Sequence, residues 1–144
     1  GRNQICDLEM EQNFMEQVGW SRLLTSPYFV HCSDRLAELF ADVTVPGMTI
    51  SAPGFYAPQG RYLRLCSADP ELNAKIERFE YAGHRFTNFE MEGSALAGLA
   101  KLLGHEATTI STVIAQRVAL DMETDYRPFV DKMIVTSLEK LAQI

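Results

Sequence analysis

The sequence contains few cysteines and no pattern of residues that typically binds a metal. Its three cysteines, Cys6, Cys32 and Cys66, are odd in number, and none belongs to a CxxC pair. This count and spacing disfavour both a disulfide framework and a zinc site, so we expect a reducing, cytoplasmic environment. The three histidines also lack the spacing of metal ligands, and we therefore expect no metal.

Positive charge is also scarce. The chain has 13 lysines and arginines against 19 aspartates and glutamates, which gives a formal net charge of -6 and an isoelectric point near 5.0. Nucleic acids are bound by basic stripes, and no such stripe occurs here, so we expect no nucleic-acid polymer as a partner. Small molecules or other proteins are the partners that this composition favours.

Long apolar runs are absent as well. The longest stretch without charge, residues 43–60, is interrupted by three prolines and three glycines, so it cannot form a membrane helix. The amino terminus has no basic segment followed by an apolar run, and we expect no secretory signal. We therefore expect no membrane partner.

The chain does have the material for one domain, with 144 residues of which 47% are hydrophobic. Helical periodicity and capping residues predict helices over residues 8–18, 34–43, 71–82, 93–103 and about 126–144. Apolar, β-branched and alternating segments predict strands over residues 27–32, 47–52, 62–65, 84–91 and 107–118. This alternation predicts an α/β domain with a mostly parallel or mixed sheet.

Three of these segments carry a prediction about burial. The helix over 93–103 is apolar on nearly all sides, which predicts that it is buried. The strand over 107–118 is almost without charge, as is typical of a central strand covered on both faces. The last helix is predicted to pack across the sheet.

Uncommon groups of residues lie where three predicted strands end, and ligands of open α/β sheets bind at the carboxyl ends of strands. The groups are residues 55–61, residues 90–92 and residues 116–117. The sequence has no Walker-type loop, GxGxxG motif, nucleophile elbow or HExxH motif that would suggest another site. We therefore expect function to lie in these three groups.

Gln59 and Arg61 carry complementary hydrogen-bonding groups. A glutamine amide offers one acceptor and two donors, and arginine offers a planar fork of donors, so the pair can read the carbonyl, N–H, carbonyl edge of uracil. Phe55 or Tyr56 would stack on a flat ring. In the alternative interpretation, Gln59 and Arg61 are solvated loop residues and the aromatic rings close the core.

Charged residues dominate the other two groups. The Glu92 carboxylate suits the adjacent hydroxyls of ribose; alternatively, it is an acid at a helix N-terminus, where it contributes roughly 0.3 to 1 kcal/mol. Glu90 alternatively pairs with a surface cation. Arg117 follows an almost uncharged strand, where an unpaired charge is costly to desolvate, so it either pairs with Asp121 or Glu123 or faces a polar ligand.

Together these groups resemble a known family. The segments GFYAPQGRYLRL, TNFEMEGSALAGLAKLLGHEA and TVIAQR are similar, in order and separation, to the carboxyl-terminal half of the uridine phosphorylases in the nucleoside phosphorylase superfamily. The resemblance implies a three-layer α/β/α sandwich with a central mixed sheet, in which residues 1–144 form the carboxyl-terminal part of a single domain. It also implies a homo-oligomer, either a dimer or a hexamer.

The resemblance implies roles for individual residues. The base-binding residues would be Phe55, Gln59, Arg61, Ile114 and Arg117. Of these, Gln59 and Arg61 would also be the catalytic residues. In the ribose site, Glu92 would hold the 2'-hydroxyl side, Met91 would pack on the sugar and Glu90 would support them.

The chain departs from the family's pattern at several positions. Gln116 stands where asparagine is common, and Gly93 stands where serine or cysteine is usual. Purine-preferring relatives carry a Ser-Asp pair at the end of the third segment, whose aspartate protonates the purine. Ile114 and Ala115 occupy that place here, which favours a pyrimidine base.

The implied reaction is the reversible phosphorolysis of uridine, with inorganic phosphate as co-substrate and no cofactor, to uracil and ribose 1-phosphate. The family's phosphate site comes from a glycine-rich loop and arginines in the amino-terminal half, and no residue of this chain matches it. We therefore expect the 144 residues alone not to phosphorolyse uridine. Alternatives are a purine nucleoside phosphorylase or a nucleosidase of the same fold, or a non-catalytic module for nucleoside binding or oligomerisation.

Overall fold

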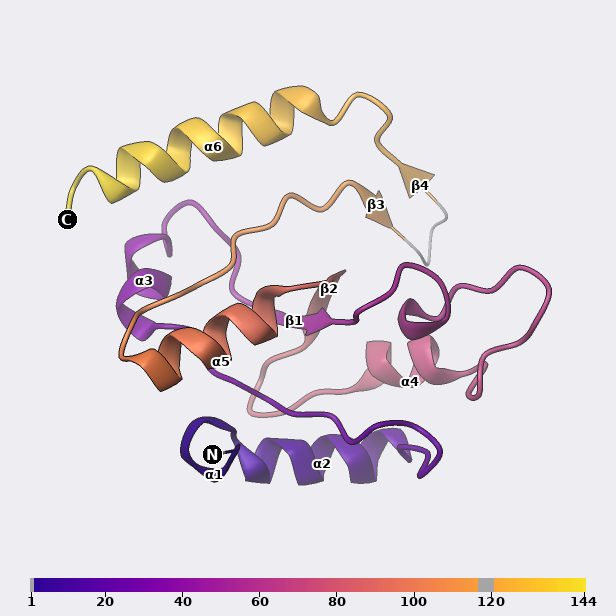
Figure 1. The fold of residues 1–144 in the computed structure, drawn as a ribbon. Coiled ribbons are helices and arrows are strands. Elements are labelled where there is room, and N and C mark those ends of the chain that lie inside the picture. The colour runs from indigo at the N-terminus through magenta and orange to yellow at the C-terminus, as the bar shows by residue number, and fades with distance from the viewer. Residues whose placement is uncertain (1, 117–120) are drawn as a thin grey trace.

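A small parallel sheet lies at the centre of the computed structural model, which describes residues 2–116 and 121–144 (Figure 1). Its strands β1 (Met48–Ser51) and β2 (Phe86–Glu90) pair in parallel, with Thr49 opposite Asn88 and Ser51 opposite Glu90. A second, antiparallel pair consists of the short strands β3 (Ala115–Gln116) and β4 (Asp121–Met122). The described part of the chain is thus a mixed α/β arrangement with a small parallel sheet.

Among the described residues, helices and a 3₁₀ turn connect and cover these strands. The helices are α1 (Arg2–Ile5), α2 (Leu8–Val18), α3 (Asp34–Leu39), α4 (Leu72–Arg78), α5 (Gly93–Leu103) and α6 (Arg127–Leu141). The 3₁₀ turn η1 (Ala57–Gln59) lies with α4 in the connection from β1 to β2. Within residues 2–116 and 121–144, no helix has both the length and the apolar character needed to cross a membrane.

The main core lies where α2 and α4 meet one face of the parallel sheet. Its buried members are Phe14, Val18, Ile76 and Phe79, and partly buried side chains from both strands pack against them. The Phe14 ring lies edge-on to the Phe79 ring, with ring centres 5.2 Å apart. The remaining face of β1 is directed toward α5, since the Ser94 N–H donates to the Ser51 hydroxyl.

The capping residues in the sequence correctly predicted where two helices, α2 and α3, begin. Asp7 caps α2 by accepting a hydrogen bond from the Met10 N–H at 2.9 Å, and the helix ends at Gly19, whose φ of 62° suits glycine. Ser33 caps α3 in the same way through the Leu36 N–H. The predicted positions of both helix starts are therefore confirmed.

The predicted helix over 71–82 is shorter than expected. It ends at Arg78 because Phe79 adopts an extended conformation and turns its ring into the core. Gly83, predicted as the end of this helix, instead lies with φ 80° in the tight turn between Tyr81 and His84. The predicted helix over 34–43 likewise ends early, at Leu39.

Three predicted strands are wrong in whole or in part. Residues 27–32 form only an isolated bridge between Val30 and Cys6, and residues 62–65 form no strand. Of the predicted central strand, only Ala115 and Gln116 are in a described strand, and both are exposed. A strand needs a neighbour that pairs its backbone along its whole length, and among the described residues these segments have only short partners, such as Cys6 for Val30 and β4 for Ala115 and Gln116.

Two predictions about helix burial are also wrong. In α5 only the small residues Ala97 and Gly98 are buried, with Gly98 close to Ile5 and Val30, whereas the leucines remain exposed. The helix α6 has no buried residue and does not cross the parallel sheet. It lies beside the segment that leads into β3, as Figure 1 shows, with the Thr112 hydroxyl 3.3 Å from the Met133 sulfur.

Candidate functional site

Two of the residue groups singled out in the sequence leave the same edge of the parallel sheet. Ser51 ends β1 and Glu90 ends β2, and these two residues lie opposite each other. The pairing extends one step further, since the Ala52 N–H donates to the Glu90 carbonyl at 2.9 Å. The loop over residues 53–61 and the segment over residues 91–92 therefore begin side by side.

Phe55, Gln59 and Arg61 form one cluster in the first of these loops. One guanidinium nitrogen of Arg61, Nη1, donates to the Phe55 carbonyl and to Gln59 Oε1, both at 2.7 Å. The guanidinium carbon lies 3.8 Å from the centre of the Phe55 ring, as in a cation–π contact. Gln59 is buried, whereas the Phe55 ring is 54% exposed and open to a ligand.

The backbone of this loop is shaped by a left-handed glycine and by α4. Gly60 has φ 70° and follows the turn η1, which reverses the chain so that Arg61 returns to Phe55. From α4, the Asn73 amide donates to the Gln59 carbonyl at 3.3 Å and lies directly against Gly60. Asn73 thus supports the loop from behind, a role that no sequence pattern indicated.

We expect Gly60→Ala to destabilise the protein more than Gly19→Ala. Both glycines have a φ near 65°, where an alanine costs about 1–2 kcal/mol, but only at Gly60 does the added Cβ collide, at 2.3 Å from the Asn73 amide nitrogen. Urea unfolding of both variants would measure the difference. Equal losses of unfolding free energy in the two variants would mean that the Asn73 side chain moves aside without cost and does not support the loop.

The Glu90 carboxylate is fully engaged at the start of α5. Its Oε1 accepts from the Ser51 hydroxyl, and its Oε2 accepts from the Glu92 and Gly93 N–H groups at 2.8 and 2.5 Å. Burial raises the pKa of Glu90, but these hydrogen bonds and one from the Met91 N–H outweigh it and hold the pKa below its ordinary value. Glu90 is thus the acid that satisfies the helix N-terminus.

Glu92 and Met91 are placed differently from Glu90. Both side chains are exposed, and the Glu92 carboxylate has no hydrogen-bond or ion-pair partner among residues 2–116 and 121–144. Glu92 occupies the N-cap position of α5 without capping it. The two acids therefore have separate roles in the structure, and Glu92 is the one available to a ligand.

Gly93, the departure from the family's usual serine or cysteine, has a structural reason. A Cβ at this position would lie 2.8 Å from the Thr109 hydroxyl and 3.1 Å from the Glu90 carboxylate. Glycine therefore lets residue 109 approach the start of α5 closely.

The remaining predicted base-binding residues are not joined to the Phe55 cluster by any contact of the described residues. Ile114 lies in a small pocket of about 230 Å³ beside β4 and α6, lined also by Thr112, Val113, Glu123 and Phe129. Its carbonyl accepts from the Glu123 N–H at 2.9 Å. Arg117 lies outside the described residues.

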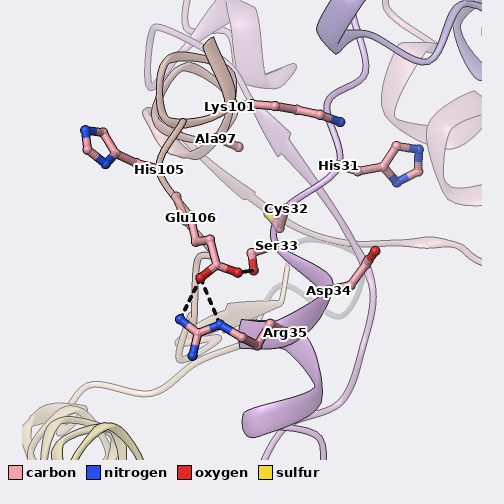
Figure 2. A pocket seen from close by; sticks show the side chains of 10 residues that line it. His31, Cys32, Ser33, Asp34, Arg35, Ala97, Lys101, His105 and Glu106 are labelled. Carbon is pink, nitrogen blue, oxygen red and sulfur yellow. Dashed lines mark hydrogen bonds and ion pairs between the residues drawn. The ribbon is translucent and has the colours of Figure 1, made fainter. Parts of the chain in front are cut away.

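A larger pocket, of about 350 Å³, lies between α5 and the start of α3 and was not indicated by the sequence. Figure 2 shows the Glu106 carboxylate at its wall, bound by the Arg35 guanidinium and the Ser33 hydroxyl. Arg35 and Ser33 hold the pKa of Glu106 below its ordinary value. The ion pair between Arg35 and Glu106 links α3 to the segment that follows α5.

Comparison with known proteins gives the family. No curated protein and no solved structure matches the chain. A family model described as the Phosphorylase superfamily matches residues 4–144, a range that includes the Phe55 cluster and both acids of the Glu90–Glu92 segment. The chain belongs to the phosphorylase superfamily, which comprises nucleoside phosphorylases and nucleosidases.

Proposed function

We propose that the protein is a uridine phosphorylase, which converts uridine and inorganic phosphate reversibly to uracil and ribose 1-phosphate. One observation carries the proposal: the Phe55, Gln59 and Arg61 cluster and the Glu92 carboxylate, which has no partner among the described residues, start from the same edge of the parallel sheet. A flat base with an imide edge and a sugar with adjacent hydroxyls are the ligand groups that these side chains recognise.

The base would bind against the Phe55 ring. Arg61 donates to Gln59 there and its guanidinium lies over the Phe55 ring, so both polar groups would be next to the edge of a base bound against the exposed part of this ring. Gln59 is 5% exposed, which limits the freedom of its amide and favours a defined orientation. In this proposal Ile114 and Arg117 complete the base site.

The sugar would bind at the start of α5. Glu92 would accept hydrogen bonds from the ribose hydroxyls, and Met91, which is 41% exposed, would pack on the sugar ring. Both oxygens of the Glu90 carboxylate already accept hydrogen bonds, from Ser51 and from two backbone N–H groups, so Glu92 is the better acceptor for the sugar. Glu90 would support the ribose site by holding the backbone from which Glu92 projects.

The chemistry requires charge stabilisation on the base. A phosphate oxygen forms a bond to the anomeric carbon while the bond from that carbon to the uracil nitrogen breaks, and the electron pair of the broken bond remains on uracil. Arg61 would stabilise the negative charge that spreads to the uracil oxygens. The bound geometry of the two substrates supplies much of the remaining acceleration.

We further propose that residues 1–144 form the carboxyl-terminal part of a three-layer α/β/α domain that assembles as a homo-oligomer. The small parallel sheet and the family match support this arrangement. The phosphate would then be bound by residues that this chain does not supply. The isolated 144 residues are accordingly expected not to phosphorolyse uridine, and turnover by them would refute this part of the proposal.

The test is the loss of uridine, followed by ultraviolet absorbance, using the protein expressed from its complete gene. We expect uracil to form only when phosphate is present, and uridine to be turned over faster than inosine. Faster inosine turnover would favour a purine nucleoside phosphorylase, and turnover without phosphate would favour a nucleosidase. Binding of uridine without any product would favour a non-catalytic nucleoside-binding module.

A variant of Glu92 tests the ribose site within the same assay. Glu92→Gln is expected to lower kcat/KM for uridine roughly 10- to 150-fold, since a hydrogen bond to a charged group contributes about 1.5–3 kcal/mol. With 2'-deoxyuridine the loss should be much smaller, because the hydroxyl that Glu92 would bind is absent. Glu139→Gln, an exposed acid on α6, is the matched control and should leave both substrates unaffected.

A further inference from the structure

Ser51 connects three elements at the edge of the sheet where the proposed ribose site lies. It is the last residue of β1, lies opposite Glu90 at the end of β2, and contacts the first turn of α5. Its hydroxyl donates to Glu90 Oε1 and accepts from the Ser94 N–H at 2.8 Å. A hydroxyl has one donor and two acceptor sites, and this one uses the donor and one acceptor.

The Ser51 and Glu90 side chains together bind the first N–H groups of α5. Glu90 accepts from the N–H groups of Glu92 and Gly93, and Ser51 accepts from that of Ser94, so three consecutive N–H groups are bound. These are groups that an α-helix leaves without internal partners. The bond between the Ser51 hydroxyl and the Glu90 carboxylate joins both acceptors into one unit, which we name the Ser51–Glu90 clamp.

We propose that Ser51 is a positioning residue for the ribose site, acting through the Ser51–Glu90 clamp on the backbone that carries Met91 and Glu92. This inference rests on the proposed function. Met91 and Glu92 lie between the clamp's carboxylate and the first turn of α5, and the Glu92 N–H is itself bound by the clamp. Ser51 has no contact with the reacting atoms in this role.

The clamp would act on catalysis through geometry. Both Glu92 and Met91 are exposed, and the Glu92 carboxylate has no partner among the described residues, so their direction depends largely on the backbone at the start of α5. A displacement of about 1 Å at a positioned group costs on the order of 10²-fold in rate. Loss of the Ser51 hydroxyl frees one carboxylate oxygen and one helix N–H at once.

The test compares Ser51→Thr with Ser51→Val in the complete protein. The two side chains have nearly the same shape and differ in the hydroxyl, so a folding or packing defect affects both. We expect Ser51→Thr to stay within a few-fold of the wild-type protein. Ser51→Val should lower kcat/KM for uridine roughly 10- to 100-fold with the KM for phosphate unchanged, and should accelerate amide hydrogen exchange at Glu92, Gly93 and Ser94.

A control from the same strand accompanies the pair. Thr49 lies two residues before Ser51 on the same face, and its hydroxyl donates to the Asn88 side chain across the sheet at 2.9 Å. Thr49→Ala removes this cross-strand bond but leaves the clamp, and we expect it to keep wild-type kinetics. A similar loss of kcat/KM in Thr49→Ala would mean that the effect of Ser51→Val comes from weakened sheet pairing in general and not from the clamp. That result would overturn the inference.

The outcomes separate this inference from the proposed function. If the wild-type protein phosphorolyses uridine and Ser51→Val matches Ser51→Thr, the role of Ser51 is refuted and the function stands. If the wild-type protein does not phosphorolyse uridine, both the role of Ser51 and the proposed function are refuted. A loss in Ser51→Val that appears equally in the KM for phosphate would point to a general structural role and would also refute the positioning role.

Discussion

Arg61→Ala is expected to lower kcat/KM for uridine by roughly 10²- to 10³-fold, the usual cost of removing one preorganised donor from a site where charge develops. In the structure the Arg61 guanidinium holds both the Gln59 amide oxygen and the Phe55 carbonyl, so the variant also loosens the remaining base-binding groups. Arg61→Ala should lower kcat as well as raise KM, because the negative charge on uracil grows as the bond to the sugar breaks.

Arg61→Lys should recover only part of this activity. Lysine keeps the positive charge but lacks the planar fork, in which Nη1 binds Phe55 and Gln59 while the other N–H groups would remain for the uracil edge, and it lacks the flat group that lies over the Phe55 ring. An activity between those of the alanine variant and the wild-type protein is therefore expected. Full recovery by lysine would show that charge alone matters and that the fork geometry does not.

The matched control is Arg85→Ala, which removes an arginine of the same chain from an exposed ion pair with Glu80. Surface pairs of this kind contribute about 0–1 kcal/mol to stability, so the variant should be nearly as stable and as active as the wild-type protein. Steady-state kinetics with uridine and phosphate, together with thermal unfolding of each variant, would measure both effects. An active Arg61→Ala would exclude Arg61 from the base site.

The base cluster was accessible from the sequence because its residues are close together in the chain. Phe55, Gln59 and Arg61 lie within seven residues, and a turn with a left-handed glycine is enough to bring them together. The helix starts at Asp7 and Ser33 were accessible for the same reason, since a cap acts on the next three residues. Local chemistry of this kind can be read without knowledge of the fold.

The roles of the two acids depend on contacts between distant segments. Ser51 and Glu90 are 39 residues apart, and a single serine in a strand carries no pattern that points to its partner. Their pairing decides that Glu90 serves the helix while Glu92 remains open, a division that the motif FEMEG does not contain. The same limit explains the incorrect strands, because apolar composition cannot say which segment lies alongside to pair the backbone.

The incorrect prediction that α5 is buried has a different origin. An apolar helix is predicted to be buried because exposed leucine is unfavourable, but burial depends on how much surface is near enough to cover the helix. Here only the side with Ala97 and Gly98 meets other elements of the described chain, and the two-stranded sheet is too narrow to cover the leucines as well. Composition alone therefore set the wrong expectation for this helix.

Phe14→Ala is expected to lower the free energy of unfolding by about 3–5 kcal/mol, the range for removing a large aromatic side chain from a core. Phe14 is 3% exposed and lies at the centre of the main core. Its ring is 5.2 to 5.5 Å, centre to centre, from the rings of Trp20, Phe29, Phe79 and Phe86. The alanine variant would lose these contacts together and leave a cavity between α2, α4 and the sheet.

Urea unfolding, followed by circular dichroism, would measure this loss, with Phe129→Ala as the matched control. Phe129 is 53% exposed on α6, so its removal should cost much less than that of Phe14. A natural domain has about 5–15 kcal/mol of stability, so the Phe14 variant should be close to unfolded in mild conditions. Comparable losses in the two variants would mean that α6 is as tightly packed as the core, contrary to the structure. A negligible loss in Phe14→Ala would mean that the aromatic cluster does not hold α2 and α4 to the sheet that carries the candidate site.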